Sequence, residues 1–197
     1  GDHRDLHSFP TRRSSDLDYE SEDLVNSYHN DIKEYHIGLV IVSKEIFAKR
    51  SMRTMLYESH VPVLKISDQS FSAVKDAVLV LTENRDLEKV STTIFDISVQ
   101  MGFNIELHNY ISEHQDEKEQ VIEHYNNLST IFTKSIKVIQ ENDNPIRALK
   151  QKENFLQILP FTEKLTKREL YSMFSTDSER HYHKLDSYHQ MFIPVQL

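Results

Sequence analysis

Short apolar runs alternate with stretches of helical periodicity along most of this chain, and this alternation restricts the fold more than any other feature. Ala77–Leu81 is apolar throughout, which is typical of a strand covered on both faces. Leu87 to Met101 then carries apolar residues at helical spacing, and Gly102 follows where a left-handed C-terminal residue is expected. Strands alternating with helices predict a parallel sheet with right-handed crossovers.

The same alternation continues toward the C-terminus. Further strands are expected at 104–111, 135–139, 155–159 and 191–195, and further helices at 116–132, 145–150 and 167–174. Pro145 suits the first position of its helix, where a missing N–H costs nothing. The fold class expected from residue 75 onward is therefore α/β, a Rossmann-like five-stranded parallel sheet with helices on both faces.

The upstream residues suggest part of a second unit of the same kind. A helix around Leu24–Ile32 precedes expected strands at 39–42 and 61–66, with a helix at 49–57 between them. Residues 43–56 align with residues 161–174, with Lys49 opposite Lys167 at a spacing of 118 residues. One interpretation is two tandem copies, with 18–70 the C-terminal part of a truncated copy and 75–197 a complete one. The other is that amphipathic helices after strands resemble each other by composition alone.

His7–Leu17 resembles the translation of a common sequencing adapter over eleven consecutive residues. We therefore expect residues 1–17 to be a non-native, disordered leader, and residues 18 onward to be the C-terminal part of something longer. The alternative is a genuine polar N-terminal arm.

Glycine and cysteine usage excludes several kinds of site. Average usage is about 7% Gly, but this chain has Gly1, Gly38 and Gly102 alone, each isolated from the others. Phosphate-binding loops need glycines where the backbone approaches a phosphate, so no such loop is expected. Cysteine is absent, which excludes disulfides, thiol nucleophiles and thiolate zinc sites and fits a reducing, cytoplasmic location.

The charge balance restricts the partners. The formal net charge of −8 argues against nucleic acid and anionic membranes as partners. No apolar run approaches the roughly 20 residues that span a bilayer, so direct membrane insertion is not expected.

A ligand site is conceivable where the central strands end. In an open parallel sheet, ligands bind at the carboxyl ends of strands beside the point where strand order reverses. The residues that would converge there follow the first and fourth strands of the complete unit: Thr82, Glu83, Arg85, Thr162, Lys167 and Arg168. Arg85, Lys167 and Arg168 could neutralise an anion. The alternative, which we favour, is ordinary solvated surface charge.

A histidine-rich segment near the C-terminus invites a metal interpretation. His181, His183 and His189 with Asp186 are residue types that suit zinc. We favour a polar connection, because the segment has the character of a loop or helix. No G-x-S-x-G elbow is present to project a nucleophile. We therefore expect no catalytic residues, no metal and no cofactor.

The order of elements and the two similar tails resemble the universal stress protein domain. More narrowly, the chain is similar to the C-terminal region of a bacterial family with N-terminal TrkA-type (RCK) domains, a module of potassium transport. That narrower resemblance rests on the stretches Leu87–Ser98, Glu153–Phe161 and Phe174–Ser178. It implies a regulatory or interaction region whose partners are the missing N-terminal domains and a membrane ion-transport subunit, with homo-oligomers as a further possibility.

The chain departs from that resemblance at one point. ATP-binding universal stress proteins have a Gly-rich segment after the fourth strand, but Pro160–Lys167 and Ser43–Lys49 have no Gly and each contains a Glu. ATP binding in the usual mode is therefore not expected. The leading hypothesis is a non-catalytic regulatory region. The alternatives are a small-molecule sensor that binds a nucleotide or other anion and, less favoured, a phosphate-transfer enzyme.

The resemblance also implies how the two units associate. Universal stress domains commonly associate through their last strands, so we expect residues 63–66 to lie near residues 191–195 in antiparallel orientation.

Overall fold

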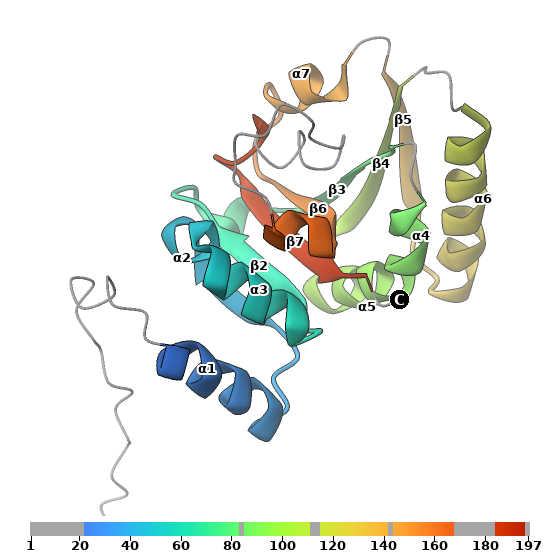
Figure 1. Ribbon diagram of the computed structural model, residues 1–197. Helices are drawn as coiled ribbons and strands as arrows, with labels where there is room; N and C mark the ends of the chain where they lie inside the picture. Colours follow the sequence, from blue (N-terminus) through green and yellow to red (C-terminus); the bar gives the residue numbers. More distant parts are fainter. Residues whose placement is uncertain (1–21, 83–84, 111–114, 142–143, 168–183, 196–197) are drawn as a thin grey trace, which may run out of the picture.

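The computed structural model describes residues 22–82, 85–110, 115–141, 144–167 and 184–195, shown in Figure 1. The strands are β1 (Val40–Ser43), β2 (Val63–Ile66), β3 (Asp76–Val80), β4 (Asn104–Tyr110), β5 (Ile136–Glu141), β6 (Phe155–Phe161) and β7 (His189–Pro194). The helices are α1 (Glu22–Glu34), α2 (Lys44–Ala48), α3 (Arg50–Glu58), η2 (Phe71–Ala73), α4 (Asp86–Lys89), α5 (Ser91–Met101), α6 (Gln115–Ile131), α7 (Pro145–Leu149) and α8 (Glu163–Lys167). None of these described helices is long and apolar enough to cross a lipid bilayer.

All seven strands form one sheet in the order β1-β2-β7-β6-β3-β4-β5. The five strands from β3 onward are parallel to one another, as expected. The expected five-stranded sheet is nevertheless too small, because β1 and β2 extend it to seven strands. We call residues 22–67, which contribute β1 and β2, the upstream segment, and residues 75–195 the downstream unit.

The upstream segment joins the sheet through β2, which runs antiparallel to β7. Val63 lies opposite Phe192 and Leu64 lies opposite Met191. The antiparallel approach expected for residues 63–66 and 191–195 is therefore confirmed. The described strands of the upstream segment and of the downstream unit thus form one continuous sheet.

Several expected helices differ in detail from those observed. The helix expected from Leu87 to Met101 is divided into α4 and α5 at Val90, beside which the Ser91 hydroxyl donates to the Glu88 carbonyl at 2.7 Å. Such a side-chain bond competes with regular helical bonding. The expected helix end is confirmed, because Gly102 adopts a φ of 73°. Of the helix expected at 167–174, residues 168–174 lie outside the described residues.

The spacing of elements differs by one residue from the sequence alignment of the two tails. The helices after β1 and β6 begin at Lys44 and Glu163, a spacing of 119 residues rather than 118. This spacing places Val42 opposite Phe161, and both side chains pack in the same apolar cluster. A partial second copy remains a prediction.

Helices α5 and α6 cover one face of the downstream unit. Their buried residues Ile94, Phe95 and Tyr125 pack in one cluster with alternate residues of β3 and β4, among them Leu79 and Ile105. The buried Tyr125 hydroxyl donates to the Leu87 carbonyl at 2.9 Å. The intervening residues of β3 face the opposite side, where Ile146 and Leu149 of α7 pack on Val78 and Val80.

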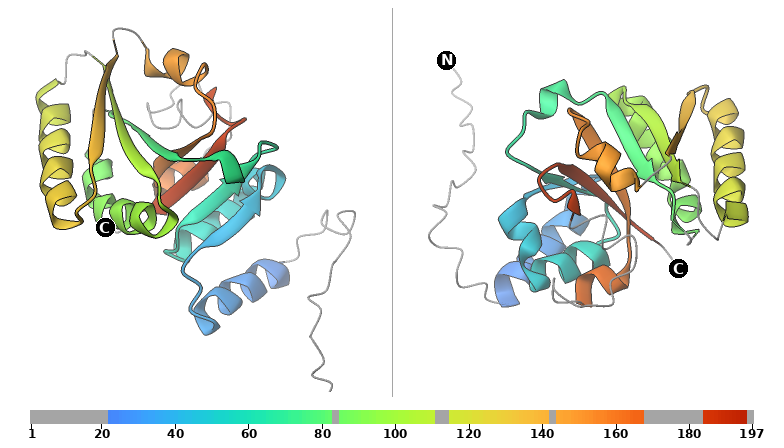
Figure 2. Two further views of the ribbon diagram at one scale, coloured as in Figure 1. Left: turned by 180° about the vertical axis from the view of Figure 1, so that it is seen from behind. Right: turned by 90° about the horizontal axis from the view of Figure 1, so that it is seen from above.

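An aromatic cluster joins the upstream segment to the downstream unit on the face that bears α2, α3 and α8. Phe47 of α2 is fully buried and stacks on Phe192 of β7, with ring centroids 4.3 Å apart. Its ring also lies 5.8 Å from that of Phe161. Helices α3 and α8 pack side by side over this cluster (Figure 2). The two parts of the chain therefore share a hydrophobic core.

Replacing Phe47 tests this shared core. We expect Phe47→Ala to lower the free energy of unfolding by about 3–5 kcal/mol, because a large aromatic side chain leaves a cavity between both parts. Urea denaturation, followed by circular dichroism, measures the loss. Ile131→Ala is the control, since Ile131 is 74% exposed and should change stability by less than about 0.5 kcal/mol. A loss for Phe47→Ala as small as that of the control would contradict a shared core.

Candidate functional site

The structure brings two of the six predicted ligand residues together at the carboxyl ends of two neighbouring strands. Strands β3 and β6 are parallel neighbours, so Thr82 after β3 and Thr162 after β6 lie beside the point where strand order reverses. Thr82 is buried and Thr162 is half-buried. Glu83, Arg168 and the side chain of Lys167 lie outside the described residues.

Arg85, the third predicted residue that the structure describes, is engaged by a neighbour. Its guanidinium donates to both carboxylate oxygens of Glu88, at 2.9 and 2.7 Å. The Arg85 side chain is 54% exposed, and the contact with Glu88 raises its pKa. An incoming anion would compete with this carboxylate.

A small cavity lies near the carboxyl end of β7. Its volume is about 130 Å³, and its lining includes His60, Lys89, Thr93 and Pro194. Ligand pockets for drug-sized molecules are larger, about 300–1,000 Å³. The cavity formed by these described residues is therefore too small for a nucleotide.

A row of buried polar side chains crosses three neighbouring strands, and we call Lys65, Gln190 and Gln157 the polar row. Lys65 of β2 pairs with Gln190 of β7, which pairs with Gln157 of β6. Each side chain is at most 1% exposed. Gln190 Nε2 donates to Gln157 Oε1 at 2.7 Å, and Gln157 Nε2 has no hydrogen-bond partner among the described residues. Such groups are costly to bury in a sheet.

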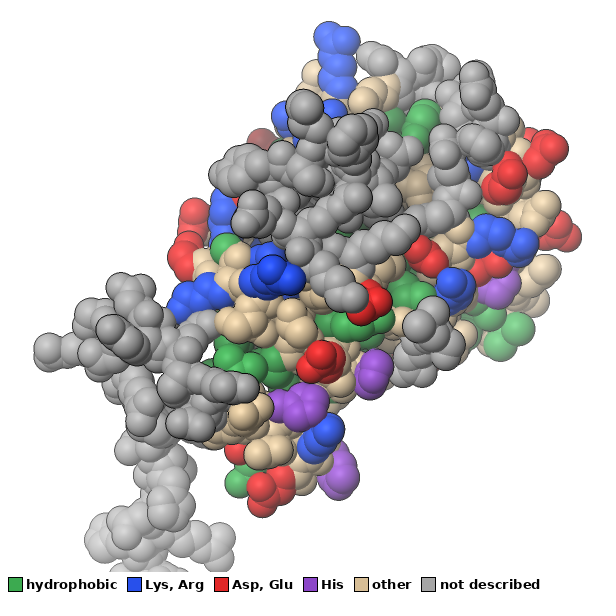
Figure 3. All heavy atoms as spheres, in the orientation of Figure 1, with side chains coloured by type: hydrophobic (Ala, Val, Ile, Leu, Met, Phe, Trp, Pro, Cys, Tyr) green, Lys and Arg blue, Asp and Glu red, His purple; other side chains and the backbone are tan. Residues whose placement is uncertain are grey.

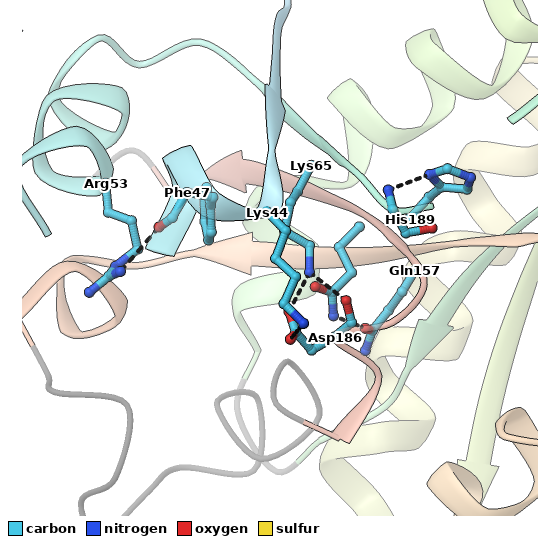
Figure 4. Close-up of polar contacts among 9 residues, drawn as sticks. Lys44, Phe47, Arg53, Lys65, Gln157, Asp186 and His189 are labelled. Carbon is cyan, nitrogen blue, oxygen red and sulfur yellow. Dashed lines mark hydrogen bonds and ion pairs between the residues drawn. The ribbon is translucent and has the colours of Figure 1, made fainter. Parts of the chain in front are cut away.

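Asp186 links the polar row to the helix that follows β1. Lys65 Nζ lies 2.6 Å from Asp186 Oδ1 and donates to the Asp186 carbonyl at 2.9 Å. Lys44 at the start of α2 forms an ion pair with the other carboxylate oxygen. Figure 4 shows both lysines directed at the carboxylate. Two lysines of the upstream segment therefore contact one carboxylate of the downstream unit.

The groups around Asp186 favour the ionised form of its carboxyl group. Burial alone would raise the pKa of Asp186, but hydrogen bonds and positive charge from Lys44 and Lys65 hold it below its ordinary value. Burial lowers the pKa of Lys65, and Asp186 partly offsets that effect. The contact with Asp186 raises the pKa of Lys44. A lysine between two strands is thus balanced by a carboxylate that is itself partly accessible to solvent.

The metal interpretation of the histidine-rich segment gains no support from the described residues. Asp186 contacts two lysines, whereas His189 is directed away from it and accepts a hydrogen bond from Ser67 N at Nδ1, 3.1 Å (Figure 4). Burial lowers the pKa of His189. His181 and His183 lie outside the described residues. No group of three or more potential ligands that could hold a metal occurs in the described ranges.

A second ion cluster lies at the amino ends of the strands of the downstream unit. Lys152 Nζ contacts Asp76 Oδ2 at 2.8 Å and Glu106 Oε2 at 3.0 Å. His108 Nε2 lies 3.3 Å from the same Glu106 oxygen. Burial would raise the pKa of Asp76 and Glu106, but Lys152 keeps both below their ordinary values. This cluster lies opposite the end at which ligands bind in such sheets, so we assign it a structural role.

Sequence reasoning missed the polar row, although a signal was present. Lys65 and Gln157 each interrupt strands that are otherwise apolar, in Val-Leu-Lys-Ile and Phe-Leu-Gln-Ile-Leu. A single long polar residue within a buried strand needs a partner of its own. The partner of Lys65 lies 121 residues away, so the local sequence does not identify it.

Figure 3 shows how the charged side chains of the described residues are distributed on one face. Among the side chains coloured there, Lys and Arg are interspersed with Asp and Glu. Nucleic-acid binding surfaces are typically continuous and basic.

Comparison with known proteins identifies the fold but no family. The sequence matches no protein-family model and no curated protein. A universal stress protein from Archaeoglobus fulgidus DSM 4304 matches in structure with a TM-score of 0.53 and 11% identity, over 87% of this chain and 65% of that protein. The present chain therefore spans less than two thirds of that protein's length.

Two further solved structures match to a similar degree. The cytoplasmic domain of a prokaryotic cation chloride cotransporter has a TM-score of 0.53 and 11% identity, over 86% of this chain and 68% of that one. A functionally unknown protein from Pseudomonas aeruginosa PAO1 has a TM-score of 0.52 and 11% identity, over 89% and 69%. At this identity the likeness concerns the fold alone. The chain has a universal-stress-protein-like α/β fold with a mostly parallel sheet.

Asp186→Asn tests the ion cluster between the two parts of the chain. We expect it to lower the free energy of unfolding by about 2–3 kcal/mol, because the buried Lys65 ammonium loses the carboxylate that it contacts. Urea denaturation at neutral pH measures the loss. Lys44→Ala is the matched control, since the Lys44 side chain is 53% exposed and surface ion pairs contribute only about 0–1 kcal/mol. Equal losses in the two variants would show that Lys65 does not depend on Asp186.

The lowered pKa values predict a loss of stability in acid in two phases. His189 has a folded pKa below its unfolded value, so its contribution begins to fall as the pH drops below about 6.5. Asp186, Asp76 and Glu106 contribute stability above the ordinary carboxyl range, and this is lost as the pH falls through their lowered values, below about pH 4. Urea denaturation between pH 8 and 3 separates the phases. His189→Gln should reduce the first phase and Asp186→Asn the second, whereas identical pH profiles in all three proteins would refute these assignments.

Proposed function

We propose that residues 22–195 act as a non-catalytic regulatory or protein-interaction region built from universal-stress-like units. The junction between the upstream segment and the downstream unit carries this proposal. There β2 pairs with β7, Phe47 packs on Phe192, and Asp186 contacts Lys65. A junction filled by strands, aromatic rings and an ion pair favours a rigid assembly of two units over a ligand cleft between them.

The described residues at the carboxyl ends of β1, β3 and β6 show no features of a phosphate site. No glycine occurs in Ser43–Lys49 or Pro160–Lys167, which contain the ends of β1 and β6 and the helices that follow them. Arg85 is engaged by Glu88. These observations support a role that does not depend on ATP.

The proposed context is potassium transport. The resemblance to TrkA-type (RCK) proteins favours a cytoplasmic region attached to RCK domains, with a membrane ion-transport subunit as partner and homo-oligomers in addition. One structural neighbour is the cytoplasmic domain of a cation chloride cotransporter, which supports an association with ion transport at the level of fold. In this proposal the upstream segment is the C-terminal part of a second universal-stress-like unit.

One observation favours the alternative of a small-molecule sensor. Thr82 and Thr162 lie at the edge of the sheet where β6 and β3 meet and the strand order reverses. A nucleotide or other anion bound there would contact the site predicted from the sequence: Thr82, Glu83, Arg85, Thr162, Lys167 and Arg168.

A thermal-shift screen with ATP, AMP and cyclic dinucleotides separates the two functions. At a ligand concentration one hundred times the Kd, a site would add about 2.7 kcal/mol of stability and raise the Tm by about 5–10 °C. The regulatory proposal predicts a change of less than about 1 °C for every nucleotide, because no phosphate cradle is expected. A shift of several degrees that is lost in Arg85→Ala and retained in Lys75→Ala would establish the sensor instead. Lys75 is a suitable control because it is exposed at the opposite end of β3.

A further inference from the structure

Strand β1 forms one edge of the sheet and borders an apolar groove. Among the described strands, β1 pairs with β2 alone. The groove has a volume of about 520 Å³ and lies between α1 and β1, with Ile32 and Tyr28 on one side and Val40 and Val42 on the other. Ile41 in the middle of β1 is 60% exposed. Ile32 and Val42 are buried, whereas Tyr28 is 42% exposed. Within the part of the chain that the structure describes, the edge at Ile41 and the rim of the groove at Tyr28 are therefore accessible.

The two edges of the sheet differ in how they are protected. Strand β5 at the far edge carries Lys137, whose side chain is 69% exposed, and ends in Glu141. Charged residues on an edge strand discourage pairing with other chains. Strand β1 consists of Val-Ile-Val-Ser, with no charge and no proline. The β1 edge thus lacks the charged residues that discourage the β5 edge from pairing with another chain.

The downstream unit shows what covers the corresponding edge. Strand β6 follows α7 and precedes α8, as β1 follows α1 and precedes α2. On one side β6 pairs with β7, as β1 does with β2, and on its other side it pairs in parallel with β3. Val78 and Val80 of β3 project toward α7 and pack with its apolar residues. The groove between α1 and β1 occupies the place that corresponds to β3.

We propose that the β1 edge binds an extended apolar strand of a partner polypeptide, parallel to β1. Alternate side chains of this strand fill the groove against α1, and the others lie beside Ile41 on the opposite face. The inference rests on the equivalence of the upstream segment to the end of a second unit, which is part of the proposed function. The test of this inference does not involve nucleotides, so its failure can be distinguished from the failure of the proposed function.

A synthetic peptide supplies the probe. A fluorescein-labelled peptide with the sequence of residues 74–82, extended by lysines for solubility, is titrated with the whole chain and followed by fluorescence anisotropy. Saturable binding is expected, with Ile41→Lys weakening it at least tenfold because a charge is placed on the edge. Val138→Lys is the matched control on the β5 edge, where Val138 is 41% exposed, and should leave the affinity within about twofold.

Crosslinking tests the orientation. The chain has no cysteine, and a Cβ at Gly38 meets no atom within 4 Å, so Gly38→Cys introduces a single thiol just before β1. A parallel strand places the N-terminus of the peptide near this thiol. The peptide cysteine is first activated as a thiopyridyl disulfide, so that the protein thiolate attacks it and thiopyridine leaves. A peptide activated at an N-terminal cysteine should therefore form the mixed disulfide at least tenfold faster than one activated at a C-terminal cysteine.

Three results would overturn the proposal. They are absence of saturable binding, equal binding by Ile41→Lys and the unmodified chain, and faster crosslinking to the C-terminal cysteine. Sedimentation of the chain alone decides a fourth case. If the chain self-associates through the β1 edge, so that Ile41→Lys makes it monomeric and the peptide cannot compete, the occupant is a second copy and not a partner strand.

Discussion

The antiparallel pairing of β2 with β7 is the interaction on which the rest of the structure depends. Without it, β1 and β2 would be a two-stranded ribbon with α1, α2 and α3 on one side, and such small sheets are rarely stable alone. With it, the aromatic ring of Phe47 lies against Phe192, and α3 packs beside α8. One backbone contact thus gives the upstream segment access to the core of the larger unit.

The same pairing buries a charged side chain in the middle of the sheet, and this side chain needs a polar partner. Lys65 lies at a buried position of β2 only because Gln190 of β7 is its strand neighbour and Asp186 is within reach. Buried ion pairs often contribute little net stability, since desolvation offsets the attraction. Their effect is then on specificity: a shift of the pairing by one residue would move Lys65 to the other face of the sheet, away from Asp186. The pair therefore favours the observed register of β2 on β7.

The sequence predicted most strands and the parallel order of the downstream unit, because buried strands are marked by continuous apolar runs such as Ala77–Leu81. It also predicted the end of α5, where Gly102 adopts the left-handed conformation. It did not predict the break at Val90 or the contact of Lys65 with Asp186. Both depend on which side chain reaches which group after the sheet has formed, and local periodicity carries no such information. For the same reason the contact of Arg85 with Glu88 was not predicted, and a ligand at Arg85 stays a prediction.

The position of β7 has a consequence for folding. It is the last described strand in the chain, yet it lies third in the sheet, between β2 and β6. Its partner β2 is more than a hundred residues earlier, so the contact order of this pairing is high and its formation is expected to be slow. During synthesis, β2 must wait until nearly all of the described chain has left the ribosome. Until then this edge of β2 stays open, and a chaperone that covers it would protect the nascent chain from aggregation.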